Sequence, residues 1–282
     1  RSHLGVVLGA AIGAAILVGA LLVGSSVQQT LHRMALDRLG KIDHAMVTGD
    51  RLFREQLATD LSDESVSAVP VLLLPGTAVN SDTGQRANRV QIVGVNEAFW
   101  QLANDVPEIG GIGEDQVVLN DWLAHNLKLD VGDEIVLRVP KLSSLSRDAP
   151  MAPQEDTSTG LRLEVAAIVN SDQMGRFSLQ ANQVPPFNAF VSLERLQERV
   201  NAEQQANVCL LSGTAKTKDL SARLKEHFTL QDVDLQLRLL SDDRGIELRS
   251  PRVFLDVTVV DAAKAAFPDA QLIQTYFVNA LR

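Results

Sequence analysis

The 282-residue chain is poor in cysteine, in aromatic residues and in runs of basic residues. Its one cysteine, Cys209, excludes an internal disulfide bond, and structural zinc sites usually need at least two thiolates. Aromatic residues make up 4% of the chain and hydrophobic residues 45%, so any core must be mainly aliphatic. The net charge of −9 and the lack of a basic tract exclude an ordinary nucleic-acid partner.

The motifs of the common enzyme classes are also missing. No Gly-x-Ser-x-Gly nucleophile elbow occurs, and the glycine-rich stretch 108–113 lacks the Lys-Ser/Thr pair of a phosphate-binding loop. Cys209 and the two tryptophans, Trp100 and Trp122, are predicted to be core residues. We therefore predict no enzyme activity, no catalytic residues, no cofactor and no metal site. No histidine spacing typical of zinc ligands occurs among His3, His32, His44, His125 and His227.

What the chain does have is a long apolar run near its start. Residues 4–24 contain only Gly, Ala, Val, Leu and Ile. A helix of this length spans roughly 32 Å, which matches the hydrocarbon core of a bilayer at about 30 Å. The apolar region of a signal peptide is shorter than this run. The small residues at 24–26 nevertheless resemble a cleavage site, so a cleaved signal peptide remains an alternative. We expect a transmembrane helix over residues 1–26.

Small residues form a stripe along this helix. Gly5, Gly9 and Gly13 recur every four residues and share one helix face. Such stripes let a second membrane helix approach closely, so we predict that these glycines pack against other membrane helices. The alternative is a generic glycine-rich span. Basic residues after the span outnumber Arg1 before it, which by itself favours a cytoplasmic position for the C-terminal side.

Beyond the span, the pattern first stays helical and then becomes rich in short strands. Apolar residues at helical spacing predict a stalk over 27–62, and the rest, 63–282, is predicted to be a mixed α+β domain with an optional subdomain break near 200. Gly40 and Gly49 are candidate interruptions of the stalk, with a second helical stretch over 50–61. The other expected helices are 97–102, one capped by Asn120 or Asp121, 192–200, 219–228 and 257–266. The expected strands are 69–76, 89–95, 117–119, 134–139, 161–169, 189–191, 206–211, 235–240, 246–248 and 270–277. Loops are expected at 80–88 and 142–159, and a turn at 242–245.

Four motifs follow one another in a recognisable order within this domain. They are a V-x-G-V-like strand with a following aromatic at 90–100, W-L-A-x-x-L then L-x-V-G-D-E-I-x-L within 117–137, a V-x-G-I-V-like strand at 163–169, and an A-F-V-P-L-like segment at 187–193. Together they resemble the core domain between the first and second membrane helices of MacB/FtsX-type ABC-transporter permeases. The resemblance covers residues 4–200. Ala167 stands where the family usually has a second glycine, and the loop at 142–159 is longer than expected.

The resemblance implies the placement and the partners of the chain. The domain would lie outside the cytoplasm of a bacterial inner membrane and the N-terminus inside, which overrules the charge argument. An ABC ATPase, fused or separate, would supply energy for moving the domain during export or extraction of a substrate. The span would contact lipid and either the other membrane helices of the permease or a second copy. Further membrane helices would follow Arg282, so the chain would be a fragment.

Two other classes of protein share parts of this pattern. A single-span sensor or binding module would have the same anchor and the same α+β domain, and would bind a ligand outside the cytoplasm. An anchored hydrolase would also share them, but the missing nucleophile and metal motifs disfavour it. Three further hydrophobic spans after Arg282 would favour the permease, and one or none would favour the sensor.

Overall fold

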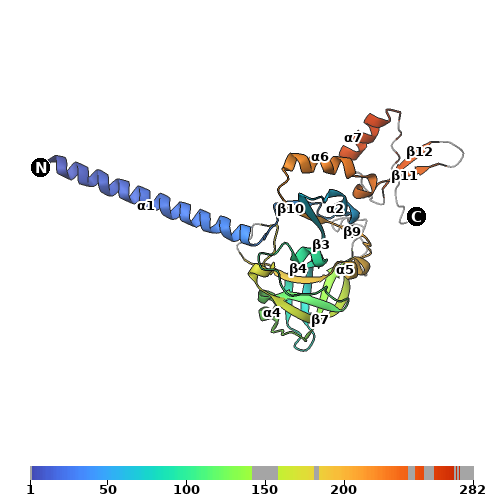
Figure 1. Ribbon diagram of the computed structural model, residues 1–282, viewed down its shortest axis with the longest axis horizontal. Coiled ribbons are helices and arrows are strands. Elements are labelled where there is room, and N and C mark those ends of the chain that lie inside the picture. The colour runs from blue at the N-terminus through green and yellow to red at the C-terminus, as the bar shows by residue number, and fades with distance from the viewer. Residues whose placement is uncertain are drawn as a thin grey trace, which may run out of the picture.

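The structure, a computed structural model, describes residues 2–141, 158–180, 184–240, 245–250, 257–269, 271 and 273. A long helix extends away from a strand-rich domain, which confirms the expected α+β class with one N-terminal apolar helix (Figure 1). The expected turn at 242–245, the strand at 270–277 and the loop at 142–159 lie wholly or mostly outside the described residues. The helices are α1 (Ser2–Asp37), α2 (Gln56–Leu61), α3 (Glu97–Trp100), α4 (Asp121–Leu127), α5 (Leu193–Val200), α6 (Thr217–His227) and α7 (Val257–Ala266), with the 3₁₀ turns η1 (Ser171–Gln173) and η2 (Leu230–Val233).

Most strands belong to one mixed sheet with the order β1-β10-β3-β4-β8-β5-β7-β6. Two small pairs, β2 with β9 and β11 with β12, lie outside it. The strands are β1 (His44–Val47), β2 (Phe53–Arg54), β3 (Val66–Asn80), β4 (Arg86–Val95), β5 (Gln116–Asn120), β6 (Glu134–Pro140), β7 (Ser158–Val169), β8 (Phe187–Ser192), β9 (Gln205–Ala206), β10 (Val208–Gly213), β11 (Gln236–Leu239) and β12 (Ile246–Arg249).

The long strand β3 takes part in two different arrangements along its length. Residues 66–71 pair with β10, and the residues from Leu72 onward pair with β4. The last four, Thr77–Asn80, also pair with β6, which pairs with β7 on its other side. The strands β3, β4, β8, β5, β7 and β6 therefore close into a barrel, and closure removes the open edges that a sheet would otherwise present. The strands β10 and β1 extend from the other half of β3.

Two cores lie on opposite faces of the barrel strands. Along β8, Ala189 and Val191 belong to one core and Phe190 to the other, as the alternation of side chains along a strand requires. The first core is aliphatic, as the composition predicted. The second gathers the scarce aromatic residues: the ring of Phe99 lies 5.3–5.6 Å, between centroids, from those of Trp100, Phe177 and Phe190. Trp100 is thus the core residue that was expected.

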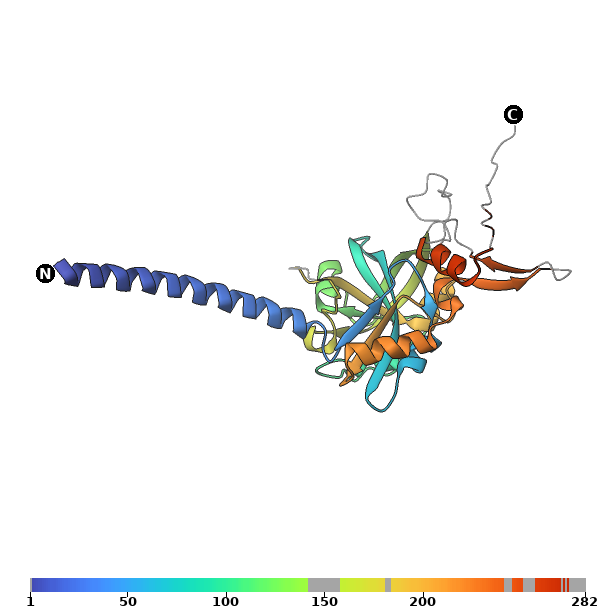
Figure 2. The same ribbon diagram turned by 90° about the horizontal axis from the view of Figure 1, so that it is seen from above.

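A third, smaller core joins α2 to the C-terminal part of the chain. It includes Leu57 and Leu61 from α2 and Leu220 from α6. The helix α6 buries only Leu220, and no residue of α7 is buried. The β11/β12 hairpin stands out from the domain on the side away from α1 (Figure 2). This part of the chain is therefore held to the domain by few apolar contacts.

The structure corrects several predictions. The strand expected over 69–76 runs as β3 from Val66 to Asn80, and β4 begins at Arg86, within the loop expected at 80–88. The stalk helix ends at Asp37, because Gly40, one of the two glycines expected to interrupt it, turns the chain with φ +56° and residues 44–47 pair with β10 instead. Of the second helical stretch expected over 50–61, Gln56–Leu61 forms as α2. Pairing in the tertiary structure outweighs the local helical spacing there. Trp122 is 44% exposed and is not a core residue, because α4 turns Leu123 and Leu127 inward and Trp122 lies off that face. The division of the chain at 26 and 62 stays a prediction.

Candidate functional site

The first candidate site is α1 itself. Residues Val7–Thr30 form a helix that is long and apolar enough to cross a membrane, and none of it is buried against the domain. At about 1.5 Å per residue these 24 residues span roughly 36 Å, somewhat more than the hydrocarbon core. Its large apolar side chains are at least half exposed all the way along, from Val7 at 66% to Val27 at 54%. A helix that is apolar on every side needs lipid or other helices around it.

The predicted packing stripe lies on this exposed helix. Gly5, Gly9 and Gly13 are all exposed, and a Cβ atom built at any of them would meet nothing within 4 Å. The space beside the stripe is therefore open to another helix. No partner helix is present, so the packing role of the three glycines stays a prediction.

The second candidate site is the joint between α1 and the domain. At Gly40 the left-handed backbone, with φ +56°, allows a turn in which a Cβ atom would overlap the carbonyl oxygen of Leu102. The backbone N–H of Lys41 donates to that same carbonyl at 2.8 Å. Two residues on, the N–H of Asp43 donates to the Leu211 carbonyl at 2.9 Å, and its carboxylate accepts from the N–H of Gly213 at 2.8 Å. The helix is thus fixed to the domain by hydrogen bonds within a few residues of its end.

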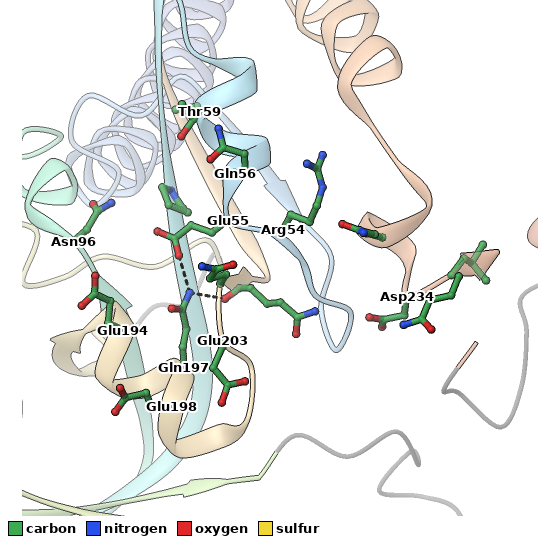
Figure 3. Close-up of a pocket in the computed structure, with 17 residues that line it drawn as sticks. Arg54, Glu55, Gln56, Thr59, Asn96, Glu194, Gln197, Glu198, Glu203 and Asp234 are labelled. Atoms are coloured by element: carbon green, nitrogen blue, oxygen red, sulfur yellow. Dashed lines mark hydrogen bonds between the residues drawn. The ribbon is translucent and has the colours of Figure 1, made fainter. Parts of the chain in front are cut away.

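The third candidate site is a polar groove of about 1010 Å³ in the domain (Figure 3). One wall comes from α5 and the loop after it, and the opposite wall from β2 and α2. Residues of β3 lie between the walls, and η2 with the start of β11 closes one end. Figure 3 shows the carboxylates of Glu194, Glu198 and Glu203 along one side of the groove, with Arg54 and Asp234 toward the other.

A buried glutamine connects the two walls of the groove. Gln197, which is 3% exposed, donates through its side-chain nitrogen to the Glu55 carboxylate at 3.0 Å and to the Gln205 carbonyl at 2.9 Å. Its neighbours on α5, Glu194 and Glu198, are exposed, and the spacing i, i+3, i+4 puts all three on one helix face. The Ser192 side chain accepts a hydrogen bond from the Arg195 N–H and so caps this helix, as the sequence predicted.

At one end of the groove a buried ion pair ties η2 to β2. The Asp232 side chain is fully buried, and its two oxygens accept from Arg54 Nε at 3.0 Å and from the terminal guanidinium nitrogen at 3.1 Å. Burial raises the pKa of the Asp232 carboxyl, but hydrogen bonds from Arg54 and from Thr229 more than reverse this, so its pKa is lowered overall. The pKa of Arg54 is raised, chiefly by its hydrogen bond to Asp232.

The residues considered for chemistry do not line the groove. Cys209 is buried in β10, and burial raises the pKa of its thiol to about 12, so it is a core residue, as predicted, and no thiolate forms at neutral pH. Within the described part of the chain, no three His, Cys, Asp or Glu side chains gather closely enough to hold a metal ion. His125 is exposed on α4, and His44 lies 3.3 Å, through Nε2, from the Ala215 carbonyl.

The groove and the Arg54–Asp232 pair were not predicted from the sequence. The two residues of the pair are 178 positions apart, and the residues that line the groove come from five separate parts of the chain. The one local signal was the predicted helix 192–200, which carries Glu194 and Glu198 but gives no indication of what they face.

Comparison with known proteins identifies related domains. The family model described as "MacB-like periplasmic core domain" matches residues 4–238. No curated protein matches the chain. Among solved structures, the periplasmic region of MacB from Actinobacillus actinomycetemcomitans is similar, with 10% identity and a TM-score of 0.45 over 83% of this chain and 96% of that one. The extracellular domain of the noncanonic ABC-type transporter YknZ from Gram-positive bacteria is also similar, with 10% identity and a TM-score of 0.40 over 67% and 97%.

Proposed function

Because this chain belongs to the MacB-like periplasmic core domain family of ABC-transporter permeases, we propose that it couples cytoplasmic ATP hydrolysis to movement of an extracytoplasmic domain. The movement serves export or extraction of a substrate. An ABC ATPase, as a separate subunit or a fused domain, supplies the energy, and this chain carries out no bond-making chemistry. Its N-terminus lies in the cytoplasm, α1 crosses the bacterial inner membrane, and the domain lies outside.

The joint at Gly40 is the observation that carries this proposal. A domain can follow the movement of a membrane helix only if the connection between them transmits force. Here the helix ends three residues before Gly40, where the Lys41 N–H donates a hydrogen bond to the Leu102 carbonyl. Asp43 then makes two hydrogen bonds with β10, one through its backbone N–H and one through its carboxylate. A flexible linker would have dissipated such a movement. The short, hydrogen-bonded joint supports a mechanical role.

In this proposal the three parts of the chain have distinct tasks. Residues 1–26 are the span, 27–43 connect it to the domain, and the chain from β1 onward forms the domain that acts outside the membrane. The stripe of Gly5, Gly9 and Gly13 packs against the other membrane helices of the permease or against a second copy. Membrane lipid covers the remaining faces of α1, whose side chains are apolar all round.

Purification of the full-length protein from its native membrane in mild detergent tests the proposal. We expect a stoichiometric partner with a Walker-type nucleotide site, unless such a site is fused to the chain itself. Repeated recovery without any ATPase, from a chain that has none fused, would refute the permease role. The groove would then favour the second candidate, a single-span anchored binding module.

A matched pair of variants tests the glycine stripe in the same purification. Replacing Gly5, Gly9 and Gly13 with leucine fills the face that we assign to helix packing, and we expect the partner membrane helices to be lost or reduced. Replacing Ala11 and Ala14 with leucine adds bulk to the opposite face of α1 and is expected to leave recovery unchanged. Equal recovery with both variants would contradict the assignment of the stripe.

A further inference from the structure

Among the described residues, carboxylates outnumber cations along the polar groove. Five carboxylates line it, whereas Arg54 is the one lining cation in this part of the chain and is already matched by Asp232. Glu198 has Arg195 at 3.4 Å, but Glu194 and Glu203 have no ion pair within the described part of the chain. The five carboxylates are those of Glu55, Glu194, Glu198, Glu203 and Asp234.

The charge is spread along the groove and not gathered at one point. No group of three acidic, His or Cys side chains in the described residues is compact enough for a metal ion. A ligand with several separated positive charges therefore matches the groove better than a single cation does. Between the carboxylates lie glutamine side chains, among them Gln56, Gln204 and Gln231, which can each donate and accept hydrogen bonds. Peptide groups need both kinds of partner.

At one end the groove leads to an open strand edge. Gln236, the first residue of β11, lines the groove, and β11 pairs only with β12 in the described residues. Each strand of a two-stranded ribbon has one edge whose backbone N–H and C=O groups face outward. Such an edge is a template for an added strand, in which main-chain hydrogen bonds supply affinity and alternate side chains supply specificity.

We propose that the groove binds an extended peptide segment with basic side chains at alternate positions, which adds as a strand to the outer edge of β11. The peptide backbone pairs with β11, and its lysine or arginine side chains reach the carboxylates of α5 and of Glu203. This proposal rests on the groove and the ribbon alone and does not depend on ATP coupling.

The first test measures binding of a fluorescein-labelled peptide of about eight residues, alternating Lys and Thr, a typical strand length. The full chain is held in nanodiscs of zwitterionic lipid, and anisotropy is read against empty nanodiscs. We expect the E194Q/E198Q/E203Q variant to bind about tenfold more weakly, because three favourable charge pairs are lost. The matched control, E64Q/E108Q/E114Q, removes the same charge from exposed positions outside the groove and is expected to stay within about twofold.

The second test addresses strand addition. The same peptide with N-methyl groups on alternate amides keeps its charges but cannot pair with β11, and we expect its binding to fall at least about tenfold. The proposal is overturned if wild-type protein fails to bind the unmodified peptide, if both triple variants weaken binding equally, or if the N-methylated peptide binds as tightly as the parent. An ATPase that co-purifies with the chain would leave each of these outcomes unchanged, so the two proposals fail separately.

Discussion

Replacing Gly40 with alanine tests the joint between α1 and the domain, and Gly49 provides a matched control. Both glycines have left-handed backbones, with φ +56° and +66°. An alanine in this conformation costs about 1–2 kcal/mol at either site. At Gly49 the new Cβ atom meets nothing within 4 Å, so no steric cost is added to the backbone cost. At Gly40 it would overlap the Leu102 carbonyl, and moving that carbonyl weakens its hydrogen bond from Lys41, which adds about 1–3 kcal/mol.

We therefore expect Gly40→Ala to lower the free energy of unfolding by about 2–5 kcal/mol and Gly49→Ala by about 1–2 kcal/mol. Urea unfolding of the full chain in detergent, followed by tryptophan fluorescence, measures both values. Trp100 is a suitable probe because it is 2% exposed and lies two residues from Leu102. Equal destabilisation by the two substitutions would refute the reasoning, because it would mean that the backbone conformation alone matters and the contact with Leu102 does not.

Three further predictions concern buried groups of the domain. Asp232→Asn is expected to cost about 3 kcal/mol near pH 7. Folding lowers the pKa of Asp232, so the stabilisation is fully present above the pKa of the unfolded chain, about 4, and is lost as the pH falls through the pKa of the folded chain. The free energies of unfolding of wild type and variant, measured against pH, should therefore converge in acid. Asn120→Ala removes the cap of α4 and two buried donations, to the Gly175 and Pro186 carbonyls, and should cost about 3 kcal/mol in urea unfolding, whereas a loss under about 1 kcal/mol would contradict this role. Cys209 should not react with a thiol reagent at pH 8 until the protein is unfolded, because burial raises its pKa to about 12; rapid labelling of the folded chain would contradict this.

The parts of the fold that could be predicted are those whose signals are local. Asn120 was expected to cap a helix after a short strand, and its side chain accepts the Leu123 N–H at 3.0 Å. The strand expected over 134–139 is β6, and the helix expected from Ser192 onward is α5. In each case a helix cap or the periodic spacing of apolar residues identifies the element within a few residues, so no distant contact is needed.

The features that could not be predicted depend on contacts between distant residues. The strand β1 has helical spacing of apolar residues around it, but its backbone groups pair with β10, more than 160 positions later. Closure of the barrel needs Thr77–Asn80 of β3 to meet β6, and nothing in either segment indicates this. The groove is harder still, because the glutamines and carboxylates of its walls look like ordinary surface residues until the fold places them opposite one another.

The joint and the groove lie at opposite ends of one hydrogen-bonded path. The N–H of Asp43, just after the joint, donates to Leu211 of β10, and Leu211 is paired with Ala68 of β3. Ala68 and Pro70, which pairs with Cys209, both line the groove. In the permease role that we propose, a movement of α1 at Gly40 would reach the groove through these pairings of β10 with β3. The other half of β3 lies outside this path, because it is paired with β4 and β6 within the closed barrel.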